Sequence, residues 1–117
     1  MTNIETEMEL RAVISGAKIA AFCFHSTRSA YSRRMVARLL KAGLDFPAVE
    51  FHLVDADRET LLPLLLEFGV VALPTFLVFR SGVRAKFLVG EHGEKALARH
   101  FENWFGRDRT KRGENKK

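Results

Sequence analysis

The feature that most constrains the fold is a short, almost wholly apolar run at residues 18–24, Lys-Ile-Ala-Ala-Phe-Cys-Phe. Its length and its content of phenylalanine and isoleucine are typical of a β-strand, and the absence of alternating polar positions indicates burial on both faces. A strand of this kind lies inside a layered sheet with other elements packed on each side. The chain is therefore expected to be an α/β protein.

The pattern around this run predicts one strand–helix–strand unit, followed by a hairpin and a last helix. Helices are expected at residues 5–14, 29–43, 58–68 and 93–105, and strands at residues 18–24, 49–55, 75–79 and 83–89, with a tight turn at residues 80–82. A strand–helix–strand crossover is right-handed in nearly all proteins, so the first two strands are expected to be parallel. The predicted sheet has about four strands, with a short N-terminal segment as a candidate fifth, and helices flank it.

Single residues set several boundaries in this prediction. Ser29 is a preferred N-cap, and Gly43 is a typical helix end. Pro63 must lie in the first turn of its helix, because only that turn tolerates proline. The leucines of this third helix are expected to cover most of its circumference; they are Leu61, Leu62, Leu64, Leu65 and Leu66.

Length and composition indicate one folded domain. At 117 residues the chain is long enough for a single core, and 47% hydrophobic with 28% charged residues is a typical globular composition. No apolar run approaches the roughly 20 residues that span a bilayer. The first residues show neither the basic nor the apolar region of a secretory signal. These features favour a cytoplasmic location.

The net charge of +5 is concentrated at the C-terminus. Residues 107–117 contain six basic and two acidic residues and so contribute +4 of the total. No apolar residue follows Phe105, so this segment is expected to be a disordered tail, and the folded domain is expected to span residues 1–106. The tail is interpreted either as a solvated segment that aids solubility or as a contact for nucleic acid or another anionic partner.

Cys23 is the only cysteine, so the chain cannot form an intramolecular disulfide. Its place between Phe22 and Phe24 favours a buried, inert side chain over a reactive thiol. The four histidines show no metal-ligand spacing; they are His25, His52, His92 and His100. We therefore expect no metal site, and no motif indicates a cofactor.

Several short segments together resemble the thioredoxin-like family. They are residues 70–82 (Val-Val-Ala-Leu-Pro-Thr-Phe-Leu-Val-Phe-Arg-Ser-Gly), 54–57 (Val-Asp-Ala-Asp), 67–70 (Glu-Phe-Gly-Val), 89–90 (Val-Gly) and 22–33, where the family's active-site segment would fall. The resemblance spans roughly residues 10–105 and rests on the order and spacing of these pieces. It implies a thioredoxin-like fold, with a cis bond between Leu73 and Pro74.

The chain departs from the family at the redox site. The family's Cys-x-x-Cys motif corresponds to Ser29-Ala30-Tyr31-Ser32, and the tryptophan before it corresponds to Arg28. The resemblance also places Cys23 at the family's buried aspartate and Leu53 at about the position of its lysine partner. Serine forms no disulfide, so thioredoxin's dithiol exchange is not expected here. On this basis we predict that the chain is not an enzyme.

The favoured functional hypothesis is a redox-inactive binding, chaperone or scaffold module that recognises a protein segment. In the family, the backbone before the cis-proline binds an extended peptide, and this role would fall to Ala72 and Leu73 beside Pro74. The bordering residues would be the degenerate motif positions Arg28, Ser29, Ala30, Tyr31 and Ser32, with Arg33 and Arg34. For these residues the purely structural interpretations are an ordinary N-cap, a solvated arginine cluster and a proline that only shapes its loop.

Two alternative hypotheses remain. The first is binding of nucleic acid or an anionic partner through the basic tail with Arg28, Arg33 and Arg34, because a helix N-terminus favours anions and these cations lie next to it. The second is a monothiol redox role of Cys23, which requires that this side chain be exposed.

Overall fold

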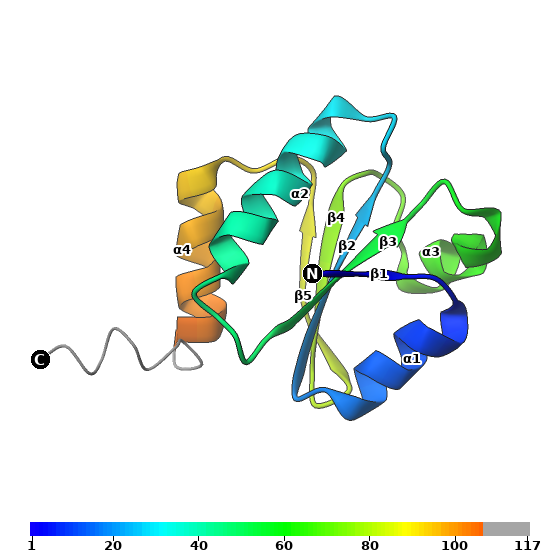
Figure 1. The fold of residues 1–117 in the computed structure, drawn as a ribbon, viewed down its shortest axis with the longest axis horizontal. Helices are drawn as coiled ribbons and strands as arrows, with labels where there is room; N and C mark the ends of the chain where they lie inside the picture. Colours follow the sequence, from blue (N-terminus) through cyan, green and yellow to red (C-terminus); the bar gives the residue numbers. More distant parts are fainter. Residues whose placement is uncertain (107–117) are drawn as a thin grey trace, which may run out of the picture.

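The computed structural model describes residues 1–106, and the predicted tail at residues 107–117 lies outside the described residues. The strands are β1 (Thr2–Ile4), β2 (Ile19–His25), β3 (Glu50–Asp55), β4 (Thr75–Arg80) and β5 (Val83–Val89). The helices are α1 (Glu7–Gly16), α2 (Ala30–Gly43), α3 (Leu62–Phe68) and α4 (Glu94–Phe105), with a short 3-10 helix at Glu59–Leu61 before α3. Figure 1 shows how the helices flank the central sheet.

The strands form one mixed sheet in the order β1-β3-β2-β4-β5. β1 and β2 both pair with β3 in parallel, whereas β4 is antiparallel to both β2 and β5. The α/β prediction is confirmed, and so is the parallel pairing of the two strands joined by α2. The short N-terminal strand completes a sheet of five strands within residues 1–106.

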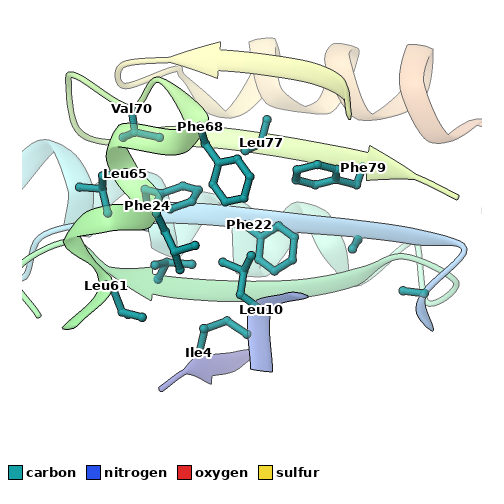
Figure 2. Close-up of a cluster of buried hydrophobic side chains, with 14 residues drawn as sticks. Ile4, Leu10, Phe22, Phe24, Leu61, Leu65, Phe68, Val70, Leu77 and Phe79 are labelled. Carbon is teal, nitrogen blue, oxygen red and sulfur yellow. The ribbon is translucent and has the colours of Figure 1, made fainter. Parts of the chain in front are cut away.

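β2 occupies the centre of the sheet, and all seven of its residues are buried. Phe22 and Phe24 point into a cluster that α1, the 3-10 helix and α3 cover, which is shown in Figure 2. Ala21 and Cys23 point to the opposite face, where α2 and α4 close a second cluster. The apolar run is buried on both faces because each face of the sheet carries its own layer of helices.

The second cluster is built largely on aromatic rings. Phe76 stacks on Phe101 with ring centroids 5.7 Å apart, and Trp104 stacks on Phe76 at 6.3 Å. Phe51 of β3 joins them, with its ring 5.6 Å from that of Phe101. Stacked and edge-to-face rings stabilise a fold beyond the burial of their apolar surface, so these contacts help to hold α4 against the sheet.

Two boundaries differ from the prediction for identifiable reasons. α1 begins at Glu7 and not at residue 5, because Thr6 forms a capping box with Glu9. Ser15 and Gly16 lie inside this helix, whose cap is Ala17. Ser29, in contrast, is the N-cap of α2 as predicted, and Pro63 lies in the first turn of α3.

The leucines of α3 lie on both its buried and its exposed sides, so they surround the helix as predicted, but not all of them are buried. Leu61 and Leu64 are fully buried, whereas Leu62 is 50% and Leu66 78% exposed. The segment changes from a 3-10 helix to an α-helix at Leu62, and only one side of α3 meets the sheet. The outer leucines are therefore left in solvent.

β5 forms one edge of the sheet, and nearly all of its residues are exposed. Its pairing with β4 shifts register between Val78 and Phe79. Among residues 1–106, no helix is both long enough and apolar enough to cross a membrane.

Candidate functional site

The start of α2 lies just beyond the carboxyl end of β2, so the loop between them holds the positions of the degenerate motif. The Ser29 hydroxyl accepts a hydrogen bond of 3.1 Å from the backbone N–H of Ser32. The Ser32 side chain is fully buried, and its hydroxyl accepts a bond of 3.2 Å from the N–H of Ser26. Both serine hydroxyls therefore hold the loop and the helix start in place.

Two backbone donors at this helix start carry no bond within residues 1–106. They are the N–H groups of Ala30 and Tyr31, since the N–H of Ser29 bonds to the Ser26 carbonyl and that of Arg33 bonds to the Ser29 carbonyl. Tyr31 itself is 61% exposed. The first turn of α2 thus presents free donors and the positive end of the helix dipole at the surface.

The loop before β4 lies at the same end of the sheet, because Thr75 at the start of β4 pairs with Phe24 near the end of β2. The Leu73–Pro74 bond is cis, the form that the resemblance implies. The Thr75 hydroxyl donates a bond of 2.7 Å to the Ala72 carbonyl, and the N–H of Gly90 donates one of 2.8 Å to the Pro74 carbonyl. The loop at residues 71–74 is therefore held by the bond from Thr75 to its own backbone and by the bond from Gly90, which follows β5.

Glu91 links this region to α2. Its carboxylate accepts two bonds from the Arg34 guanidinium, at 2.6 and 2.8 Å, and one of 2.8 Å from Arg38. The ion pairs with Arg34 and Arg38 lower the pKa of Glu91 to about 2. Residues 90 and 91 thus connect Pro74 on one side with α2 on the other, and the predicted site residues of both segments share one end of the molecule.

The arginines of the predicted site are mostly engaged within the chain. Arg28 pairs with Asp57 at 3.0 Å, and Arg34 pairs with Glu91. The pKa of Asp57 is lowered mainly by the hydrogen bond from the Ser26 hydroxyl, and to a smaller extent by the bond from Arg28. Among these arginines, only Arg33 has no carboxylate partner within residues 1–106; it donates to the Thr27 carbonyl at 2.6 Å. The expected cluster of free cations is therefore reduced to Arg33.

The sequence matches no protein-family profile and no curated protein. Solved structures do match. Plasmodium falciparum thioredoxin aligns at 18% identity with a TM-score of 0.80, over 89% of this chain and 99% of that one. Thioredoxin O2 from Arabidopsis thaliana aligns at 23% and 0.79, over 89% and 93%. Mitochondrial thioredoxin 3 from Saccharomyces cerevisiae aligns at 23% and 0.77, over 88% and 94%.

The chain has a thioredoxin-like fold. This confirms the resemblance inferred from the short segments, since the alignments extend over nearly the whole of each thioredoxin. At sequence identities of 18% and 23%, the structural likeness establishes the fold of this chain and nothing more.

The same comparison corrects the functional prediction. The hypothesis of a redox-inactive binding, chaperone or scaffold module is contradicted, and so is the statement that the chain is not an enzyme, because the neighbours of this thioredoxin-like fold are redox proteins, two of them solved in the oxidised state. For the alternative of nucleic-acid or anionic-partner binding through the basic tail with Arg28, Arg33 and Arg34, the structure shows Arg28 and Arg34 paired with carboxylates, and the tail lies outside the described residues.

Cys23 is the only cysteine of this chain, and its side chain is buried. Its side chain is 1% exposed in the cluster beneath α2 and α4, and burial raises the pKa of its thiol to about 12. The exposure that a monothiol role requires is not present in this conformation.

The structure adds three residues that the sequence analysis did not single out. Val71 is 94% exposed in the loop before Pro74, and Gly90 and Glu91 connect that loop with α2. An apolar residue in a turn next to the Leu-Pro-Thr triplet was a readable signal for Val71. No sequence signal pointed to Glu91, because its role depends on how β5 ends beside α2.

Proposed function

We propose that the chain takes part in thiol redox metabolism as a protein that binds a segment of a partner protein and activates a cysteine thiol of that partner. The chain supplies no sulfur of its own. The observation that carries this proposal is the start of α2, with its two unbonded N–H groups, fixed beside the cis-Pro74 loop in a thioredoxin-like fold. A cytoplasmic location suits this role, because a reducing compartment keeps the partner's thiols available.

Binding would use the loop at residues 71–74. Its exposed side chain Val71 and partly buried Leu73 offer apolar contacts, and Tyr31 provides a second exposed apolar surface at the start of α2. Extended segments are commonly held by backbone groups that give affinity and side-chain contacts that give selectivity. Arg33, which has no carboxylate partner within residues 1–106, favours an acidic residue in the segment.

Activation would occur at the first turn of α2. A thiol placed there loses its proton to solvent more readily, because the N–H groups of Ala30 and Tyr31 and the helix dipole stabilise the thiolate. That thiolate then attacks a disulfide of a second molecule. A new S–S bond forms, the old one breaks, and its electron pair leaves with the displaced sulfur as a thiolate.

The test measures exchange between a cysteine peptide and oxidised glutathione. The peptide carries apolar residues and one aspartate around the cysteine. Lowering the pKa of a thiol by one unit raises its thiolate fraction about tenfold at neutral pH, and the lower nucleophilicity of such a thiolate offsets part of this, so we expect a rate increase of about two- to fivefold with the chain present. Leu73→Arg and Arg33→Ser are expected to remove the increase.

Cys23→Ala is the decisive control, because the proposal gives this thiol no part in the exchange. An unchanged rate in this variant supports activation of the partner's thiol. Loss of the increase in Cys23→Ala would overturn the proposal and assign the chemistry to Cys23. No increase with the unmodified chain, at any peptide concentration, would also overturn it.

A further inference from the structure

The cations of the described residues divide into those that pair with a carboxylate and those that do not. The paired ones lie on α1 and α2, in the loop before α2 and just after β3: Arg11, Arg28, Arg34, Arg38, Lys41 and Arg58. Lys18, Arg84 and Lys86 are exposed and have no carboxylate partner within residues 1–106. None of β2, β4, β5 and the turn at residues 81–82 contains an acidic residue.

These three unpaired cations lie together at the β4–β5 hairpin. Arg84 and Lys86 belong to β5 and follow the turn at residues 81–82 closely. The N–H of Ser81 donates a bond of 2.7 Å to the Lys18 carbonyl, so the chain entering β2 lies beside the same turn. Figure 1 shows the hairpin turn at the end of the sheet opposite the start of α2. The paired cations of the candidate site are therefore remote from this basic surface.

The basic C-terminal segment continues from the same part of the molecule. The Arg80 guanidinium donates a bond of 3.0 Å to the Trp104 carbonyl, so the end of α4 is held beside the end of β4. Residues 107–117 follow α4 in the chain and carry six basic and two acidic residues. They add a charge of +4 to the three unpaired cations at the hairpin. This concentration of one sign of charge favours an anionic partner with many regularly spaced charges.

The edge of β5 also offers a surface on which a nucleic-acid base can stack. The Arg84 guanidinium lies over the Phe87 ring at 4.4 Å, and Phe87 is 38% exposed. Unpaired bases stack on guanidinium planes and on aromatic rings. An acidic protein segment satisfies the cations but has no base to place there. The combination therefore favours single-stranded nucleic acid over an acidic protein.

We propose that the hairpin end of the sheet, together with residues 107–117, binds single-stranded nucleic acid. Lys18, Lys86 and the basic residues of the C-terminal segment contact phosphates, and an unpaired base stacks at Arg84 and Phe87. Phosphate contacts carry no sequence information, so the binding depends little on base sequence. This surface is separate from the proposed activation of a partner's thiol, and neither depends on the other.

The test measures the fluorescence anisotropy of a labelled single-stranded RNA of mixed sequence with the full chain. Each phosphate contact to a single strand contributes about −0.7 to the slope of log K against log salt concentration, so five to seven contacts give a slope of about −3.5 to −5. We expect saturable binding at about 50 mM NaCl that weakens along this slope up to about 200 mM. Absence of saturable binding at the lower salt concentration overturns the proposal.

A paired comparison of variants locates the phosphate contacts. Lys18→Ser combined with Lys86→Ser should make the slope shallower by about 1.4 and weaken binding at least about tenfold at 100 mM salt. Lys41→Ser combined with Arg58→Ser lowers the net charge equally, but removes cations that are paired within the chain. This control is expected to bind within about threefold of the unmodified chain. Circular dichroism checks that both variants fold, and equal weakening in the two would overturn the proposed surface.

The choice of nucleic acid is tested at the stacking surface. Phe87→Ala is expected to weaken RNA binding about fivefold with an unchanged salt slope, because the lost contact is uncharged. Unlabelled poly-L-glutamate, which has charges but no bases, should displace the RNA at least about threefold less well than unlabelled RNA of equal charge. Full binding by Phe87→Ala, or equal displacement by poly-L-glutamate, would overturn this choice and assign the surface to an acidic protein.

Discussion

At the scale of single residues, burial decides what the two chemically interesting side chains of β2 can do. Cys23 and His25 lie two positions apart in the same strand, and burial shifts the pKa of each further toward its uncharged form. The thiol is kept protonated and the imidazole is kept neutral, in both cases because a charged group loses its hydration inside the sheet.

Cys23 is expected to be unreactive in the native chain. With a pKa of about 12 and 1% exposure, the thiolate that reacts with Ellman's reagent is almost absent at neutral pH. The release of the coloured product should follow global unfolding in denaturant, with complete reaction once the chain is unfolded. Rapid labelling of Cys23 in the native chain at pH 7 would show that β2 opens locally, and it would support a monothiol role for this residue.

His25 is expected to make the chain less stable in mild acid. Its folded pKa is lowered below the ordinary value of 6.5, so between the two values the unfolded chain binds more protons than the folded one. The free energy of unfolding should therefore fall as the pH drops from 6.5 through this window. Denaturant titrations of the unmodified chain and of His25→Phe at several pH values provide the measurement; equal slopes would contradict the prediction.

At the scale of elements, the start of α2 was predictable, whereas the exposure of the helix surfaces was not. The Ser29 cap followed from residue type alone, because only a few side chains bond the free N–H groups of a first turn. The exposed leucines of α3 could not be predicted, because they depend on how much of the helix meets the sheet.

Ser29→Ala is expected to destabilise the chain by about 1 kcal/mol, because the N–H of Ser32 loses its acceptor at the start of α2. Denaturant unfolding monitored by circular dichroism measures the change. Ser15→Ala, an exposed serine in the last turn of α1, is the matched control and should stay within about 0.5 kcal/mol of the unmodified chain. Equal effects of the two substitutions would mean that the cap contributes nothing.

The two sides of α3 provide a sharper comparison. Leu64→Ala should cost about 2 to 5 kcal/mol because it leaves a cavity in the core. Leu66→Ala should be nearly neutral, since 78% of Leu66 is already in solvent. The measurement is again the midpoint in denaturant at constant slope; a similar loss in both variants would contradict the burial described for this helix.

At the scale of the whole molecule, the fold class could be predicted from the sequence. The contacts between segments that are far apart in the chain could not. The apolar run at residues 18–24 indicated a strand covered on both faces, and periodicity placed nearly every element around it. The meeting of Pro74, Gly90 and Arg34 at one end of the sheet could not be predicted, since these residues are far apart in the chain. The sequence therefore predicted the motif residues of the candidate site, but not the contacts that hold its separate segments together.

The two hydrophobic clusters are expected to unfold together, because they share β2 and its neighbours in the sheet. Trp104 is the chain's one tryptophan and reports on the cluster beneath α4, whereas Leu64 lies in the other cluster. In Leu64→Ala the Trp104 fluorescence and the far-ultraviolet circular dichroism should shift to the same lower midpoint. A fluorescence midpoint that stays in place would show that the two halves of the core unfold separately.

The exposed edge at β5 affects how copies of the chain meet one another. A free strand edge is a template on which another chain can add a strand, and the outcome of such pairing is aggregation. Here the register shift beside Val78 makes the edge irregular, and the cations Arg84 and Lys86 alternate along it. Arg84 also lies over the ring of Phe87 at 4.4 Å, so the apolar surface of the strand is partly covered by charge. The irregular register and the cations of β5 therefore disfavour pairing between copies of the chain along this edge.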